Sequence, residues 1–118
     1  MANTFKTVTA AGITSEEQIY VAGGSVVATI LLGVMVANTT TSQVTVSIKL
    51  VSNTGSRTHS GTNSGANATV HLIKNAPVPV GSSLELLAGN KIVLEDTDEI
   101  TLTASGASDI TISIMEIT

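Results

Sequence analysis

The sequence predicts an all-β protein: a single-domain antiparallel fold, either a β-sandwich or jelly-roll-like, with about eight short strands. Three observations support this fold class. Apolar and polar residues alternate with period two in several segments, β-branched residues dominate the apolar composition, and turn-forming residues separate the segments at short intervals. A chain of 118 residues has room for one core of moderate size, so we expect one domain over residues 1–118.

The clearest strand signal lies between Val44 and Leu50, where Val, Ile or Leu occupies every second position and Thr, Ser or Lys the positions between. The same alternation recurs over 110–115 and, more briefly, over 100–104. A period of two places one face of a strand in the core and the other in water. These segments are predicted strands, and a shorter strand is predicted around 18–22.

The longest apolar run extends from Val26 to Ala37 and is interrupted by Thr29 and Gly33. Its twelve residues are too few to span a bilayer as a helix. A continuous apolar run of this length is typical of a strand that is covered on both sides. We therefore predict a strand buried on both faces.

Turn signals divide the rest of the chain. Clusters of Gly, Asn, Ser, Thr and Asp occur at 23–25, 38–42, 88–90, 95–98 and 105–108. Pro77 and Pro79 flank Val78, and because proline has no amide hydrogen this segment is excluded from the centre of a sheet. It is predicted to be an edge strand or a crossover.

One long segment has no apolar content to bury. All residues from Ser52 to Asn67 except Arg57, His59 and Ala66 are Ser, Thr, Asn or Gly. Such a composition does not offset its own ordering entropy. We expect a long polar loop that is either mobile or ordered only against a neighbour, and we expect residues 1–11 to form an N-terminal arm.

The composition excludes several classes of function. Only 12% of the residues are charged, the net charge is −4, and the lysines and arginine form no stripe, so no nucleic-acid partner is expected. The aromatic residues are Phe5 and Tyr20 alone, too few for a stacking platform. The chain has no cysteine, and its first residues lack the apolar region of a signal peptide. No membrane association is predicted.

The side chains that could carry chemistry are isolated from one another. His59 lies in the polar loop and His71 in a predicted strand, and neither has an acidic or histidine neighbour at ligand spacing. The acidic segment Glu95–Glu99 is predicted to be a tight turn, with a weak cation site as the alternative. No nucleophile elbow or phosphate-binding loop occurs. We predict no enzymatic activity, no cofactor, no metal and no small-molecule substrate.

Three passages together resemble a known class of proteins. They are IYVAGGSVV at 19–27 with its continuation to Thr40, LIKNAPVPVGSSL at 72–84, and KIVLEDTDEI at 91–100 with the closing ISIMEIT at 112–118. Their order resembles small virion structural proteins of tailed bacteriophages, particularly of the cyanophage type. This chain has Glu-Asp-Thr-Asp at 95–98, where the family usually has Glu-Ala-Gly-Asp.

The resemblance implies a virion protein, assembled in the host cytoplasm, that decorates or cements the capsid by binding the major capsid protein, and that is a homo-oligomer. A neck or tail component is the alternative within the family, and a carbohydrate- or host-surface-binding module is the alternative from another class. The scarcity of aromatic residues argues against that module. The residues expected to make contacts are Phe5, Lys6, Arg57, His59, Asn63, Pro77 and Pro79.

Overall fold

The computed structural model describes residues 2–24, 26–53, 69–86 and 90–118. Within these ranges the chain forms nine β-strands and no helix, so the all-β prediction is confirmed. The strands are β1 (Asn3–Ile13), β2 (Glu16–Val21), β3 (Ala28–Asn38), β4 (Val44–Val51), β5 (Val70–Val78), β6 (Ser83–Leu86), β7 (Ile92–Leu94), β8 (Glu99–Ala104) and β9 (Ser108–Ile117). No helix in the described parts is long and apolar enough to cross a membrane.

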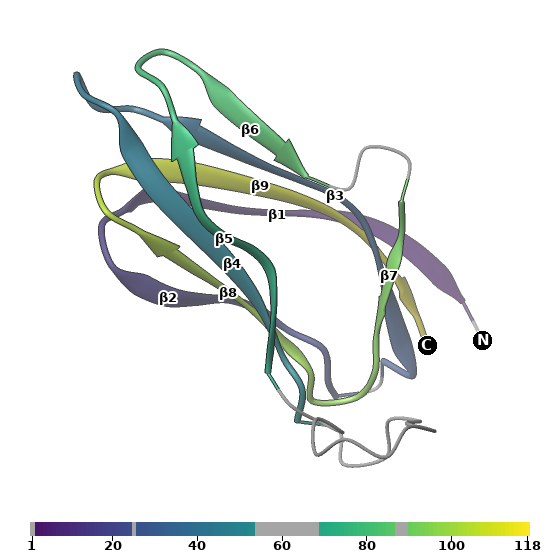
Figure 1. Cartoon of the computed structure of the whole chain (residues 1–118). Helices are drawn as coiled ribbons and strands as arrows, with labels where there is room; N and C mark the ends of the chain where they lie inside the picture. Colours follow the sequence, from purple (N-terminus) through teal and green to yellow (C-terminus); the bar gives the residue numbers. More distant parts are fainter. Residues whose placement is uncertain (1, 25, 54–68, 87–89) are drawn as a thin grey trace.

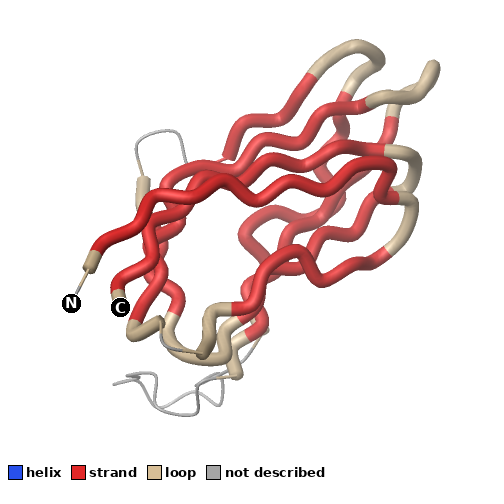
Figure 2. The backbone as a smooth tube through the Cα atoms, turned by 180° about the vertical axis from the view of Figure 1, so that it is seen from behind, coloured by secondary structure: helices blue, strands red, loops and turns tan. Residues whose placement is uncertain are grey.

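The strands form two antiparallel sheets that pack as a sandwich (Figures 1 and 2). Sheet A has the order β1-β9-β3, and the far side of β3 pairs with β7 over its first half and with β6 over its second half. Sheet B has the order β2-β8-β4-β5. The pairs are nested, with β1 on β9, β2 on β8, β3 on β6 and β7, and β4 on β5. The jelly-roll form of the sandwich stays a prediction.

The core lies between the sheets and consists of aliphatic side chains from alternate strand positions. In β9, for example, Ile110, Ile112 and Ile114 are buried, whereas Thr111 and Ser113 are exposed. The same alternation in β4 confirms the strand predicted there. The buried apolar residues are Ile13, Ala22, Leu31, Val34, Val36, Val44, Val46, Ile48, Leu50, Val78, Leu94, Ile100, Leu102, Ala104, Ile110, Ile112 and Ile114.

The prediction of an N-terminal arm over residues 1–11 is wrong for the described part of that segment. Residues 3–10 pair with β9 without interruption, from Asn3 opposite Ile117 to Ala10 opposite Ile110. Ala2 extends the pairing through backbone hydrogen bonds with Thr118 of 3.1 and 2.9 Å. The residue pattern does not indicate this strand, because β1 is an edge strand of sheet A with polar residues at most of its exposed positions.

The prediction that the apolar run is buried on both faces is also wrong. Leu31, Val34 and Val36 of β3 are at most 2% exposed and point into the core. On the opposite face Ile30 is only half-buried and Met35 is 43% exposed. The reason is that no described layer covers the outer face of sheet A (Figure 2).

Two further predictions concern the segments around β5. The edge position of the Pro77–Pro79 segment is confirmed, because β5 pairs only with β4 among the described strands and ends sheet B. The predicted polar loop lies outside the described residues except for Ser52 and Asn53, so Arg57, His59 and Asn63 have no described position. His71 is exposed in β5, as predicted for a histidine on a strand surface.

Candidate interaction surfaces

The outer faces of the two sheets differ in chemistry. The outer face of sheet B is polar: neighbouring strands place Thr101 beside Lys49 and Thr103 beside Ser47. The Nζ of Lys49 lies 2.6 Å from a carboxylate oxygen of Glu16, and this hydrogen bond lowers the pKa of Glu16. Sheet A instead exposes apolar side chains, so its outer face is the candidate interaction surface.

Four apolar residues form a continuous row across the outer face of sheet A. The strand register places Phe5 opposite Met115, Met115 opposite Ile30, and Ile30 opposite Val93. Phe5 is 72% and Val93 is 52% exposed, while Met115 and Ile30 are half-buried between them. We call this row the ridge. It brings together four strands that are distant in the sequence.

A row of small residues runs beside the ridge. Thr7, Ser113 and Gly33 are opposite one another on β1, β9 and β3, and we call this row the trough. A hollow of about 260 Å³ opens here, lined by Phe5, Lys6, Thr7, Leu32, Ser113 and Ile114. Pockets for drug-sized ligands usually measure about 300–1,000 Å³. The hollow is therefore better suited to a protein side chain than to a ligand of that size.

None of the seven residues of the ridge and the trough is charged, but Lys6, whose side chain is 53% exposed, lines the hollow beside them. The charged residues in sheet A that face outward lie nearer its other end, where Glu85 is opposite Met35 and Asp109 is opposite Ala37. Lys91 precedes β7 and is exposed at the margin. The ridge and the trough are favourable to bury against another protein, because their own residues bring no ion to be desolvated and the neighbouring Lys6 is already paired with Glu116.

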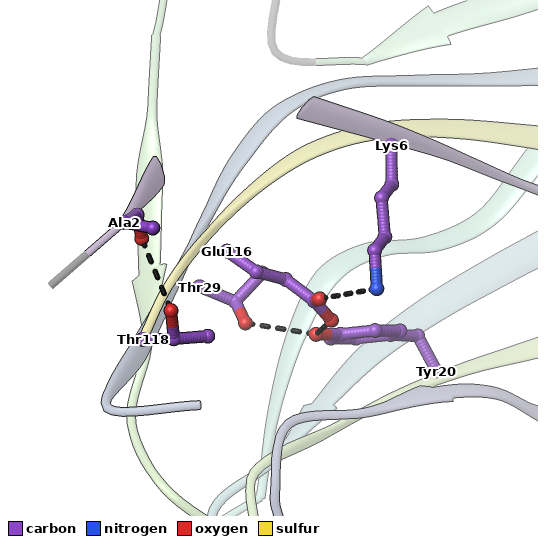
Figure 3. Close-up of polar contacts among 6 residues, drawn as sticks. All are labelled: Ala2, Lys6, Tyr20, Thr29, Glu116 and Thr118. Atoms are coloured by element: carbon purple, nitrogen blue, oxygen red, sulfur yellow. Dashed lines mark hydrogen bonds and ion pairs between the residues drawn. The ribbon is translucent and has the colours of Figure 1, made fainter. Parts of the chain in front are cut away.

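Polar side chains fill the space between the sheets behind the ridge (Figure 3). The Nζ of Lys6 lies 2.7 Å from Oε1 of Glu116. The hydroxyl of Tyr20, from the opposite sheet, donates to Oε2 of Glu116 at 2.6 Å and lies 2.8 Å from Oγ1 of Thr29. Glu116 is 9% exposed and Thr29 is fully buried. The cluster joins the two sheets at this end, and we therefore interpret its role as structural.

The pKa values in this cluster follow from its contacts. The hydrogen bond from Lys6, followed by that from Tyr20, lowers the pKa of Glu116. Burial and then the hydrogen bond to Glu116 raise the pKa of Tyr20 from 10.0 to about 12. The lowered pKa of Glu116 contributes stability above its ordinary value of 4.5, and this contribution is lost as the pH falls through the folded-state pKa.

Replacing Tyr20 by phenylalanine is expected to lower the free energy of unfolding by about 1–2 kcal/mol at neutral pH, because two buried partners lose a hydrogen bond. Since the folded-state pKa of Tyr20 is raised to about 12, its contribution is complete below pH 10.0 and is lost as the pH rises toward about 12. The wild type and the variant should therefore converge in this window. Urea unfolding at neutral pH and across this alkaline window measures the difference, and a constant difference would contradict the assignment.

The end of the sandwich away from the ridge consists of turns that the hydrogen bonds of one asparagine hold together. Asn38 is 6% exposed, and its Nδ2 donates to the carbonyl oxygens of Ser42 at 2.8 Å and Val78 at 2.9 Å. Its Oδ1 accepts from the backbone N of Thr40 at 2.8 Å and from the Thr40 hydroxyl at 2.7 Å. All four positions of the amide group are thus used, which fixes the turn between β3 and β4 against the end of β5.

Neighbouring turns are attached at the same place. The backbone N of Asn38 donates to the oxygen of Ser82 at 3.0 Å, and the Thr39 hydroxyl donates to the oxygen of Ala107 at 3.0 Å. These bonds connect the turns at 39–43, 79–82 and 105–107, which we call the turn end. Pro79 and Val80 are exposed there, and the side chain of Val80 is 54% exposed. The turn end is therefore ordered before any partner binds.

The acidic segment forms the predicted turn. Asp98 is fully buried, and its two carboxylate oxygens accept from the backbone N of Asn53 at 3.0 Å and of Glu95 at 2.9 Å. The backbone of Ala22 is bonded on both sides of the turn, to Asp98 at 2.9 Å and Thr97 at 2.7 Å. Asp98 thus joins three connecting segments. In the described ranges no three His, Asp or Glu side chains are grouped so that they could hold a metal ion.

The structure separates the residues expected to make contacts. Phe5 is in the ridge, and Lys6 is turned toward Glu116 between the sheets. Pro79 lies in the turn end, and Pro77 lies in β5 directly before it, opposite Thr45. The turn end is at the opposite end of the strands from the N terminus (Figure 1). Sequence reasoning missed Met115, Ile30 and Val93 of the ridge and the role of Asn38. The apolar outer positions of 26–37 were the available signal for the ridge.

Comparison with known proteins gives a likeness of fold. No family model matches the chain, and no curated protein matches it in sequence. A chain of the acidic stable capsid structure of Helicobacter pylori bacteriophage KHP30 superimposes with a TM-score of 0.56 and 6% identity, covering 99% of this chain and 89% of that one. A chain of the Bacillus endospore appendages, a family of disulfide-linked pili, gives a TM-score of 0.43 and 15% identity, covering 98% and 86%. At 6% identity the likeness to the phage chain shows a shared fold.

Proposed function

We propose that this chain is a non-enzymatic structural protein of a phage virion, most specifically a decoration or cement protein that binds the major capsid protein in the assembled shell. The observation that carries the proposal is the exposed apolar ridge on the outer face of sheet A, opposite a polar outer face on sheet B. A face of this kind is expected of a subunit that is buried in an assembly. The shared fold with a chain of a phage capsid supports the same class.

The turn end is the proposed contact with the shell. Its turns are already ordered by the hydrogen bonds of Asn38, so little further conformational entropy is lost when a partner binds. Pro77, Pro79 and Val80 supply exposed apolar surface there. Binding only to the assembled shell stabilises that shell by mass action. Arg57, His59 and Asn63, which lie outside the described residues, stay predicted contacts.

Two alternative functions are a neck or tail component and a carbohydrate-binding module. A neck or tail component would use the same fold, and labelling of particles separates it from a decoration protein by position. A carbohydrate-binding module needs exposed aromatic rings, and the Tyr20 hydroxyl is bonded to Glu116 and Thr29 between the sheets. Phe5 is then the one exposed aromatic ring among the described residues, which does not favour such a module.

The direct test is binding to shells. The purified protein is mixed with shells of the major capsid protein that lack it, and the shells are sedimented and heated. We expect the protein to co-sediment to saturation and to raise the temperature of shell disruption, and Val80→Lys at the turn end to weaken binding at least about tenfold. An absence of co-sedimentation at saturating protein, together with gold labelling at one vertex or along the tail, would move the assignment to a neck or tail component.

A further inference from the structure

We infer that the outer face of sheet A binds a second copy of this chain, with the ridge of each copy seated in the trough of the other. The inference adds to the proposed function by naming the partner of the apolar face. The role of such a dimer on a virion rests on the proposed function. It is carried by three properties of the face: its shape, its lack of charge and its area.

The shape of the face is complementary to itself. The ridge, from Phe5 to Val93, and the trough, from Thr7 to Gly33, are adjacent parallel rows that cross the same strands. A two-fold axis that runs across the strands between the two rows exchanges them, so each ridge faces the trough of the partner. Interfaces of this isologous kind need one patch that fits itself. The hollow of about 260 Å³ beside Phe5 is a place for the partner's protruding side chain.

The absence of charge on the face favours the same partner. The chain carries a net charge of −4, so two copies that approach at random repel each other weakly. The ridge and the trough contribute nothing to this repulsion, because their residues on β1, β9, β3 and β7 are uncharged. A partner recognised by opposite charge would need ionic groups that the ridge and the trough do not have.

The area of the overlap is that of a small interface, as expected of a weak dimer. Four strand positions at about 4.8 Å spacing and the seven residues of β1 from Asn3 to Thr9 at about 3.4 Å per residue give the part of the face that the two-fold axis covers as about 19 by 24 Å, or about 450 Å² on each partner. Specific but weak interfaces bury less than about 1,200 Å² in total, or about 600 Å² on each partner. The ridge would form the apolar centre of this interface, and Thr9 and Thr111 its polar margin.

The arrangement explains how such a protein would bridge a shell. The axis crosses β1 between Phe5 and Thr7, whereas the strand extends to Ile13, so the turn end of each copy projects beyond its partner. Because the strands of the two copies run in opposite directions, the two turn ends point away from each other. A dimer would then hold two shell contacts at once, and bivalent binding raises the overall affinity without any new contact.

The test uses two valines of nearly equal exposure. Val93 in the ridge is 52% exposed and Val80 at the turn end is 54% exposed. In sedimentation velocity without shells, we expect a dimer for the wild type at tens of micromolar. We expect Val93→Lys to weaken the dimer at least about tenfold and Val80→Lys to leave it unchanged, with the circular dichroism of both variants the same as wild type. Equal effects of the two substitutions would overturn the inference.

A third variant separates ridge-in-trough packing from general apolar association. A Cβ at Gly33 meets no atom within 4 Å, and the backbone there is not in the left-handed region, so leucine fits the isolated chain. Gly33→Leu adds apolar surface but fills the trough. We expect it to weaken the dimer, and stronger association would contradict this packing. A wild type that stays monomeric, while Val93→Lys loses shell binding, would assign the face to the shell protein; the inference would fail and the proposed function would stand.

Discussion

Replacing Ile112 by alanine is expected to lower the free energy of unfolding by about 2–5 kcal/mol. Ile112 is fully buried at the centre of sheet A, where the register places it between Val8 of β1 and Val34 of β3. Truncation removes buried apolar surface and leaves a cavity that the strands on either side are too tightly paired to close. Domains of this size are stable by about 5–15 kcal/mol, so the loss is a large share of the total.

The measurement is urea unfolding followed by circular dichroism, with Thr111→Ala as the matched control. Thr111 is the exposed neighbour of Ile112 on the same strand, and its truncation should change the free energy of unfolding by less than about 0.5 kcal/mol. Because side chains alternate between faces, a shift of one residue in the pairing of β9 would exchange the two roles. A larger loss for Thr111→Ala than for Ile112→Ala would therefore show that the assigned register is wrong.

The strands that the sequence predicts best are those with one polar and one apolar face. The inner faces of β4 and β9 are indicated directly by their alternating apolar residues, which are Val44, Val46 and Ile48 in β4 and the isoleucines in β9. β1 has no such signal, because Lys6 occupies a position turned toward the other sheet and pairs there with Glu116, 110 residues further along the chain. The pairing of β1 with β9 therefore cannot be predicted from the local pattern of residues.

The predicted surface residues show a similar limit. Phe5 stays a predicted contact residue, and its neighbours in the ridge are not predicted from the sequence, because the row exists only when β1, β9, β3 and β7 are in register. The apolar outer positions of β3 were interpreted as buried, since a single sequence does not distinguish a face covered by its own fold from one that another chain covers. On the further inference proposed above, the second copy supplies that cover.

Asn38 is the second position where a large effect is expected. Replacing it by alanine should lower the free energy of unfolding by about 2–4 kcal/mol, because the buried carbonyl of Val78 loses its donor and the turn at 39–43 loses both bonds to Oδ1. Asn38→Asp should not restore stability, since it replaces the donating Nδ2 with a carboxylate oxygen that faces two carbonyl groups. Gln43→Ala, at the exposed last position of the same turn, is the control and should cost less than about 0.5 kcal/mol.

The Asn38 variants also distinguish a structural role from a role in assembly. Urea unfolding measures the stability, amide exchange at Thr40 reports the order of the turn, and shell binding reports its use. If the turn end binds the shell because it is ordered beforehand, Asn38→Ala should weaken shell binding while Pro79 and Val80 remain in place, and should leave the ridge-mediated dimer intact. If Asn38→Ala disorders the turn but leaves shell binding unchanged, the shell contact lies elsewhere on the sandwich. If Asn38→Ala lowers the free energy of unfolding no more than Gln43→Ala does, the turns are held together by other contacts.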